Sequence, residues 1–150
     1  MKIFFILLLC GQFLFAEHIR WQSDYEASLQ KAKGQNKDIF LLILKKEDKK
    51  SLALFRDIFA NKSITKLVNQ NFIPVIVFFE NKESYPVELF YAQSFPAIFL
   101  VSKDDESYLK EPLIETFDLG ELEKILSLSF INEQLDCKCL QLINLYKEFN

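Results

Sequence analysis

The chain has 150 residues and a formal net charge of −3, and half of its residues are hydrophobic, including 16 phenylalanines. This composition indicates one packed domain and excludes a disordered or low-complexity chain, which would carry few aromatic side chains. No cluster of Lys and Arg with interleaved aromatic residues occurs, so a nucleic-acid partner is not expected.

The first 16 residues have the layout of a secretory signal peptide, with a basic start at Lys2, an apolar run over 3–15 and the small residue Ala16 for cleavage. The apolar run is shorter than the about 20 residues that a membrane-spanning helix needs. Removal of the signal peptide, which contains Lys2 and no acidic residue, leaves 17 basic and 21 acidic residues and a formal charge of −4. We therefore expect a periplasmic or secreted protein without a stable membrane span, with its folded domain over 17–130.

The first half of that domain reads as a helix, a strand and two more helices. Ser23 and Glu26 form a capping box, which predicts a helix that starts there and ends near Gly34. The short, continuously apolar run 39–44 predicts a strand covered on both faces. Apolar residues at helical spacing predict the next two helices, the first from Leu52, Phe55 and Phe59 and the second from Ile64, Leu67 and Val68.

The second half reads as three strands followed by helices. A strand is predicted over 72–79, and Pro74 within it indicates that this end lies at a sheet edge or at the start of the strand. Strands over 97–101 and, antiparallel, over 108–117 follow. Two helices are expected at the end, over 119–130 and 136–149. The order β-α-β-α-β-β-α after an extra helix predicts an α/β fold with a central mixed β-sheet flanked by helices.

Several short segments carry a resemblance to a known family that covers roughly Trp21 to Leu126. They are Ile19-Arg20-Trp21, Asp24-Tyr25, Ala27, Ala32-Lys33, Asn36-Lys37, Phe59, Asn61, Ile64 and Asn71-Phe72-Ile73-Pro74-Val75. Together they resemble small exported proteins of the thioredoxin-like superfamily, and in particular its anterior gradient branch. The resemblance implies a thioredoxin-like fold, here with an extra C-terminal helix in 131–150.

The resemblance places Asp48-Lys49-Lys50-Ser51 where a Cys-x-x-Cys motif is expected. In active members the first cysteine attacks a substrate disulfide from a helix N-terminus, and the second resolves the mixed disulfide. Neither Asp48 nor Ser51 can form a disulfide, although Ser51 fits the serine of the Cys-x-x-Ser motif in the anterior gradient branch. Asp48 is interpreted as a helix N-cap, with an acidic contact for a partner as the alternative.

Pro96, at the start of the strand over 97–101, matches the cis-proline of the family. In active members that loop presents backbone groups to an extended peptide of the client, and such a surface can survive without the cysteines. The alternative interpretation is inherited fold geometry alone.

Cys137 and Cys139 remain after signal cleavage, and two cysteines in an exported protein invite a disulfide. A helical stripe of Leu135, Cys139, Leu142, Tyr146 and Phe149 puts Cys139 on the buried face of the last helix. Cys137 then points away, because residues two apart on a helix differ by about 200° in direction. If Asp136 is the N-cap, both thiols lie in the first turn of this helix. Fraying of that turn then allows a Cys137–Cys139 disulfide, which closes a small, strained and easily reduced ring. The alternatives are an intermolecular bond through Cys137 and binding of a soft metal such as Cu(I). We expect neither a metal site nor a cofactor.

Two function hypotheses follow. The first is a non-catalytic binding or chaperone-like module for extracytoplasmic protein or peptide clients, which uses the surface around Asp48 and Phe95-Pro96. The second is an atypical thiol-disulfide oxidoreductase or isomerase that uses Cys137 and Cys139 as its redox pair. The single histidine, His18, nearly excludes a Ser/His/Asp triad. The apolar stripe of the last helix can also serve a homodimer.

Overall fold

The sheet is built around β1 (Asp38–Leu44), which has one partner on each side. The computed structural model describes residues 18–129, apart from the side chain of Phe59. Within this part the strand order is β2-β1-β3-β4. β2 (Phe72–Phe78) runs parallel to β1, whereas β3 (Ala97–Val101) and β4 (Leu113–Ile114) are each antiparallel to the strand before them in the sheet. The predicted mixed sheet is confirmed.

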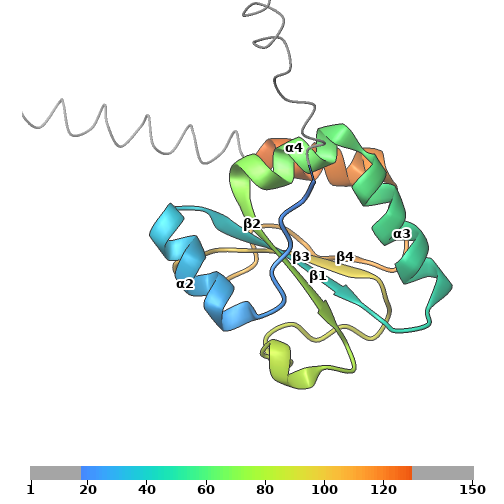
Figure 1. The fold of residues 1–150 in the computed structure, drawn as a ribbon, viewed down its shortest axis with the longest axis horizontal. Helices are drawn as coiled ribbons and strands as arrows, with labels where there is room; N and C mark the ends of the chain where they lie inside the picture. The colour runs from blue at the N-terminus through green and yellow to red at the C-terminus, as the bar shows by residue number, and fades with distance from the viewer. Residues whose placement is uncertain (1–17, 130–150) are drawn as a thin grey trace, which may run out of the picture.

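Helices cover both faces of this sheet (Figure 1). They are α2 (Tyr25–Gln35), α3 (Lys49–Ala60), α4 (Lys62–Asn71) and a further helical segment over 119–129. α2 packs on one face, and α3, α4 and the segment 119–129 pack on the other. The two faces therefore have separate cores.

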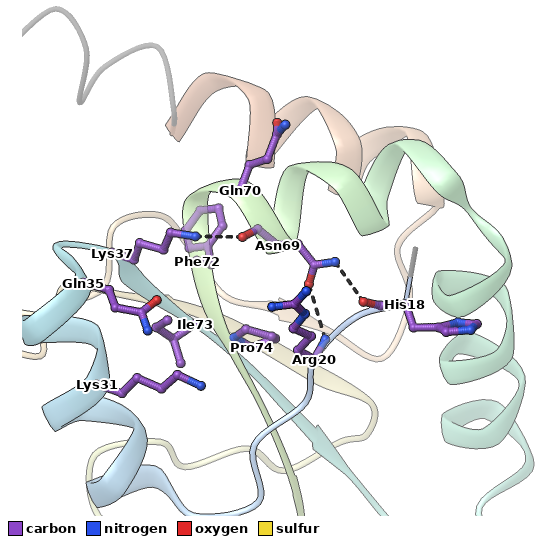
Figure 2. Close-up of a pocket in the computed structure, with 10 residues that line it drawn as sticks. All are labelled: His18, Arg20, Lys31, Gln35, Lys37, Asn69, Gln70, Phe72, Ile73 and Pro74. Carbon is purple, nitrogen blue, oxygen red and sulfur yellow. Dashed lines mark hydrogen bonds between the residues drawn. The ribbon is translucent and has the colours of Figure 1, made fainter. Parts of the chain in front are cut away.

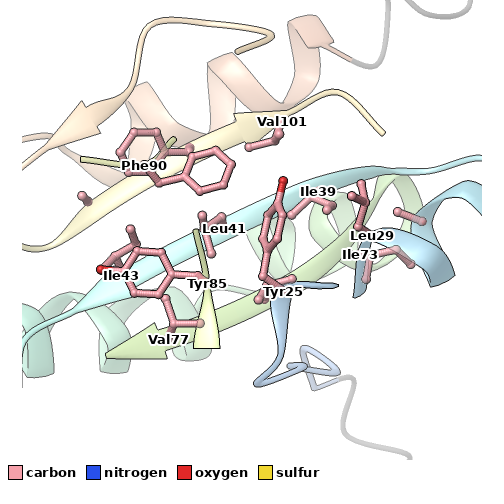
Figure 3. Close-up of a cluster of buried hydrophobic side chains, with 14 of the residues drawn as sticks. Tyr25, Leu29, Ile39, Leu41, Ile43, Ile73, Val77, Tyr85, Phe90 and Val101 are labelled. Carbon is pink, nitrogen blue, oxygen red and sulfur yellow. The ribbon is translucent and has the colours of Figure 1, made fainter. Parts of the chain in front are cut away.

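β1 supplies side chains to both cores, because successive residues of a strand point to opposite faces. Ile39, Leu41 and Ile43 pack with Tyr25 and Leu29 of α2, as Figure 3 shows. Phe40, Leu42 and Leu44 pack in the other core with residues of α3, α4 and the segment 119–129. No side chain from Ile39 to Leu44 is more than 1% exposed. The prediction of a strand covered on both faces is confirmed.

Pro74 lies on an edge strand, as the sequence predicted. On the outer side of β2, the N–H of Gln22 donates to the carbonyl of Pro74 at 2.8 Å, and the N–H of Ile76 donates to the carbonyl of Gln22 at 2.9 Å. The nitrogen and carbonyl of one strand residue point to the same side, so the donor that proline lacks is missing on this outer side. Pro74 therefore removes no hydrogen bond between β2 and β1.

The capping residues of α2 differ from the predicted ones, although the helix ends at Gln35, near Gly34 as the sequence predicts. Its N-cap is Asp24 and not Ser23, because the Asp24 carboxylate accepts a hydrogen bond from the N–H of Ala27 at 2.7 Å. Its C-terminal stop is Asn36 and not Gly34, since Asn36 adopts the left-handed conformation at φ 51°. Asparagine is the residue after glycine that tolerates this conformation best.

The buried face of α3 also differs from the predicted stripe. Leu52 is 49% exposed, whereas Ile58 and Ser51 are fully buried. The buried face is therefore the one that starts at Ser51 and reaches Ile58 two turns later, with Phe55 partly buried between them. The predicted stripe of α4 is confirmed, since Ile64 and Val68 are buried and Leu67 is partly buried.

Two connections are less regular than predicted. The antiparallel strand expected over 108–117 shortens to β4 and a single bridge between Val101 and Tyr108. Pro112 lacks a backbone donor, and Glu115 turns the chain at φ 61°. Between β2 and β3, the predicted order β-α-β-α-β-β-α has a helix that is not among the elements predicted by residue range. Residues 79–96 form only the one-turn 3-10 helix η1 (Lys82–Ser84) there.

The signal peptide over 1–16 and the C-terminal helix over 136–149 lie outside the described residues, as do Cys137 and Cys139. Among the residues that are described, none of the helices combines the length and the apolar character needed to cross a bilayer.

Candidate functional site

Asp48 is the N-cap of α3. Its backbone is extended, at φ −84° and ψ 118°, and its Oδ2 accepts a hydrogen bond from the N–H of Ser51 at 2.7 Å. This bond satisfies one of the amides that the first turn of a helix leaves free. Hydrogen bonds from the backbone and then the side chain of Ser51 lower the pKa of Asp48, and the neighbouring Lys50 and Lys45 lower it further. The carboxylate therefore serves the helix from which a family nucleophile would act.

Ser51 is enclosed by the protein. Its side chain is fully buried, and its Oγ accepts a hydrogen bond from the N–H of Lys45 at 3.3 Å. This bond joins the first turn of α3 to the residue directly after β1. A buried hydroxyl that already accepts a backbone hydrogen bond has a structural task, and an alcohol cannot resolve a mixed disulfide.

Lys50 reaches from the first turn of α3 to the opposite side of the site. Its Nζ lies 2.7 Å from Oε1 of Glu115, and the two side chains are 62% and 41% exposed. The hydrogen bond from Lys50 and then that from Ser94 lower the pKa of Glu115, while the same carboxylate raises the pKa of Lys50. Lys49, by contrast, is simply exposed.

The Phe95–Pro96 peptide bond is cis. The N–H of Glu115 donates to the carbonyl of Pro96 at 2.8 Å, so Glu115 holds the Pro96 loop through its backbone and α3 through its side chain. The Phe95 ring packs on Phe79, with ring centroids 4.7 Å apart. The structure thus brings the Asp48–Ser51 segment and Pro96 to the same end of the sheet and joins them through Glu115.

Sequence reasoning missed Glu115 and its pairing with Lys50. The two residues are 65 positions apart, and one carboxylate among many gives no signal of such a pairing. It also missed the exposed apolar side chains beside the site. Leu52 follows Asp48 by one helical turn, and Ile114, 39% exposed, precedes Glu115 and pairs with Ala97 next to Pro96.

The described part of the chain offers little for redox or metal chemistry. Within residues 18–129, no group of three or more His, Cys, Asp or Glu side chains is placed to hold a metal ion. At the Asp48–Ser51 segment the carboxylate and the hydroxyl are both committed to the first turn of α3. Thiol exchange requires a thiolate, and Cys137 and Cys139 lie outside the described residues, so their role stays a prediction.

This architecture is similar to that of known thioredoxin-like proteins. Residues 20–103 match a family model described as thioredoxin-like. No curated protein has a sequence that matches the chain. A thioredoxin from Thermus thermophilus is similar in structure, with a TM-score of 0.63 and 12% identity over 74% of this chain and 86% of that one. DsbH oxidoreductase is similar with a TM-score of 0.61 and 15% identity, over 73% and 83% of the two chains. These likenesses confirm the predicted fold and, at such identities, show the fold alone.

Proposed function

The chain belongs to the thioredoxin-like family, and from this premise we infer that it is a non-catalytic binding or chaperone-like protein. Its clients are protein or peptide segments in an extracytoplasmic compartment, the periplasm or the cell exterior. They bind at the end of the sheet where α3 begins and the Pro96 loop lies.

The observation that carries this proposal is the way Asp48 and Ser51 are built into the fold. Asp48 caps α3, and Ser51 is buried and accepts a hydrogen bond from Lys45. At positions 48 and 51, where the family motif has cysteines, this chain has residues that stabilise the first turn of α3. This supports a function of the fold other than disulfide exchange.

The surface beside this segment supports an apolar contact. Leu52 and Ile114 are 49% and 39% exposed. Of the Lys50–Glu115 pair, Lys50 lies two residues before Leu52, and Glu115 directly follows Ile114. Exposed apolar side chains rimmed by charged groups are typical of protein-interaction sites. An unfolded client segment exposes apolar side chains that can pack there.

The experiment is the aggregation of insulin, followed by light scattering after addition of dithiothreitol. A binding protein delays the aggregation of the released B chain, whereas a thiol reductase accelerates it, so the two activities have opposite signs. We expect the purified protein to delay aggregation. The variant Leu52→Ser/Ile114→Ser is expected to lose most of this effect.

The matched control is Leu128→Ser, because Leu128 is 43% exposed but belongs to the segment 119–129. We expect this variant to behave like the unchanged protein. An equal loss of the delay in the Leu128 control and in the double variant would contradict the proposed client surface, because any exposed leucine would then contribute. If the unchanged protein does not delay aggregation, the proposed function itself is contradicted.

A second candidate function is thiol-disulfide exchange through Cys137 and Cys139, and it rests on the two cysteines in the sequence. The variant Cys137→Ser/Cys139→Ser separates the candidates. Under the first function it delays insulin aggregation as well as the unchanged protein. Under the second, the unchanged protein accelerates aggregation and this variant does not. Dimerisation through 136–149 stays a prediction, which sedimentation of the purified protein tests.

A further inference from the structure

A pocket of about 670 Å³ lies beside the start of β2, and the residues of the candidate site do not line it. Figure 2 shows the parts of the chain that enclose it. Ile73 and Pro74 of β2 form its floor. The C-terminal half of α2, the C-terminal end of α4 and the segment 18–20 form its walls. The volume lies within the range of about 300–1,000 Å³ that is usual for small-molecule sites.

Asn69 fixes two of these walls to each other. Its Nδ2 donates a hydrogen bond to the carbonyl of His18 at 2.9 Å, and its Oδ1 accepts one from the N–H of Arg20 at 3.3 Å. Its own carbonyl accepts a hydrogen bond from Nζ of Lys37 at 2.8 Å. One asparagine at the end of α4 thus holds both the segment that carries Arg20 and the side chain of Lys37 (Figure 2).

Among residues 18–129, the charged side chains that line this pocket all have one sign. They are Arg20, Lys31 and Lys37, and none of the acidic residues in this range lines it, although the whole chain has three more acidic than basic residues. The carboxylate next to Lys37 in the sequence, Asp38, accepts a hydrogen bond from the N–H of Lys103 at 3.0 Å and pairs with its ammonium at 3.7 Å. Within residues 18–129, Arg20 and Lys31 form no ion pair.

Three cations that share a pocket without a counter-charge repel one another, and a bound anion removes this repulsion. Lys37 in part balances the negative end of the α4 dipole, because its ammonium caps the carbonyl of Asn69. An ammonium has three donors, so Lys37 keeps others for a ligand. The planar fork of Arg20 and the point charges of Lys31 and Lys37 suit the several acceptor oxygens of a phosphate group.

We propose that this pocket binds a small phosphate-type anion, either free phosphate or the phosphate group of a small ester, through Arg20, Lys31 and Lys37. The enclosure by walls on several sides favours a compact anion. A nucleic-acid strand would need a continuous basic track, and the sequence lacks one. This site is separate from the proposed client surface and does not depend on it.

The test is a titration of the ¹⁵N-labelled protein at neutral pH and constant ionic strength, followed by amide chemical shifts. One arm uses inorganic phosphate and the other uses glycerol 1-phosphate. We expect saturable shift changes at amides of 18–20, 31–37 and 69–73. Tighter binding of glycerol 1-phosphate identifies an ester as the ligand type, and equal or weaker binding identifies free phosphate.

The variants Lys31→Gln and Arg20→Gln are each expected to weaken binding about tenfold, the usual effect of losing one charge-assisted hydrogen bond. Both side chains are exposed, so the fold persists, and the unchanged spectrum of the unliganded variant verifies this. Lys33→Gln is the matched control, because Lys33 lies on the same helix, is exposed and does not line the pocket.

The control is expected to bind within about twofold of the unchanged protein, since a surface charge outside the pocket is screened. Equal weakening in Lys33→Gln and Lys31→Gln would overturn the proposal, because binding would then follow net charge. Shift changes scattered over lysines of the whole chain, or no saturable change with either probe, would overturn it as well.

Discussion

The Asp48–Pro96 end of the sheet and the pocket beside β2 both gather charged side chains, but they use them in opposite ways. At the first, Lys50 pairs with Glu115, and Asp48 accepts a hydrogen bond from the N–H of Ser51. At the second, and within the part of the chain that the structure describes, Arg20 and Lys31 form no ion pair and no carboxylate lines the cavity.

This difference in ion pairing indicates which of the two regions can bind a small charged ligand. A charge that already has an intramolecular partner must give it up before it can bind a ligand, and the exchange gains little. A cation without such a partner loses less on binding and is also relieved of repulsion from its neighbours. We therefore expect the proposed client surface near Asp48 and Pro96 to favour apolar segments, and the proposed pocket beside β2 to favour an anion.

The largest change we expect comes from restoring both thiols, with Asp48→Cys/Ser51→Cys in a Cys137→Ser/Cys139→Ser background. The thiol at 48 would sit at the N-terminus of α3, where free amides and the helix dipole lower a thiol pKa. The insulin assay should then reverse its sign, from delayed to accelerated aggregation. The single Asp48→Cys variant, which lacks a resolving thiol, is the control without turnover. An oxidised but inactive double variant would show that Lys50 and Glu115, or the Pro96 loop, also block exchange.

A smaller loss is expected for Ser51→Ala, which removes the acceptor of the Lys45 N–H inside the protein. Leaving this partly buried donor without its partner costs about 1 kcal/mol, and urea unfolding measures the loss of stability. Ser23→Ala is the control, because Ser23 is exposed and does not cap α2. Equal and small effects of both variants would show that the hydroxyl of Ser51 is not structural, and would weaken the contrast between the two regions.

At the pocket, Asn69→Ala should reduce stability by about 1 kcal/mol, because it removes the side-chain hydrogen bonds to His18 and Arg20. It should also weaken phosphate binding, since Arg20 is then held less firmly. Gln30→Ala is the matched control, because Gln30 is also a neutral amide, is exposed and does not line the pocket. Phosphate affinity that stays unchanged in a destabilised Asn69→Ala variant would show that Asn69 supports the fold and not the pocket.

The smallest effect concerns the Lys50–Glu115 pair, which is exposed and screened by salt. The lowered pKa of Glu115 means that its contribution is present above its ordinary pKa of about 4 and is lost as the pH falls. The raised pKa of Lys50 means that its contribution is present below its ordinary pKa of about 10 and is lost as the pH rises.

Glu115→Gln should therefore lower the melting temperature slightly between about pH 4 and about pH 10 and leave it unchanged outside this window. The same comparison in about 1 M salt should remove most of the difference. A difference that persists in salt and at low pH would show that Glu115 acts through its place in the turn after β4 and not through its charge.

The parts of the candidate site that could be predicted are those set by local sequence. Asp48 precedes a helix and is an N-cap residue, and Pro96 precedes an apolar strand. The pairing of Lys50 with Glu115 could not be predicted, because it depends on how β4 passes the start of α3. The exposure of Leu52 could not either, since the apolar residues of α3 fit two helical stripes and only packing on the sheet selects the one through Ile58.

The sequence by itself determined the elements whose hydrogen bonds or burial are local: the runs that became β1, β2 and β3, the cap of α3, and the edge position of Pro74. Only the tertiary structure decided what distant segments build together. The pocket joins residues from 18–20, 31–37 and 69–74, and each of its cations taken alone reads as an ordinary surface residue. Charges become a site only when folding brings them within interaction distance, and no pattern along the chain encodes that distance.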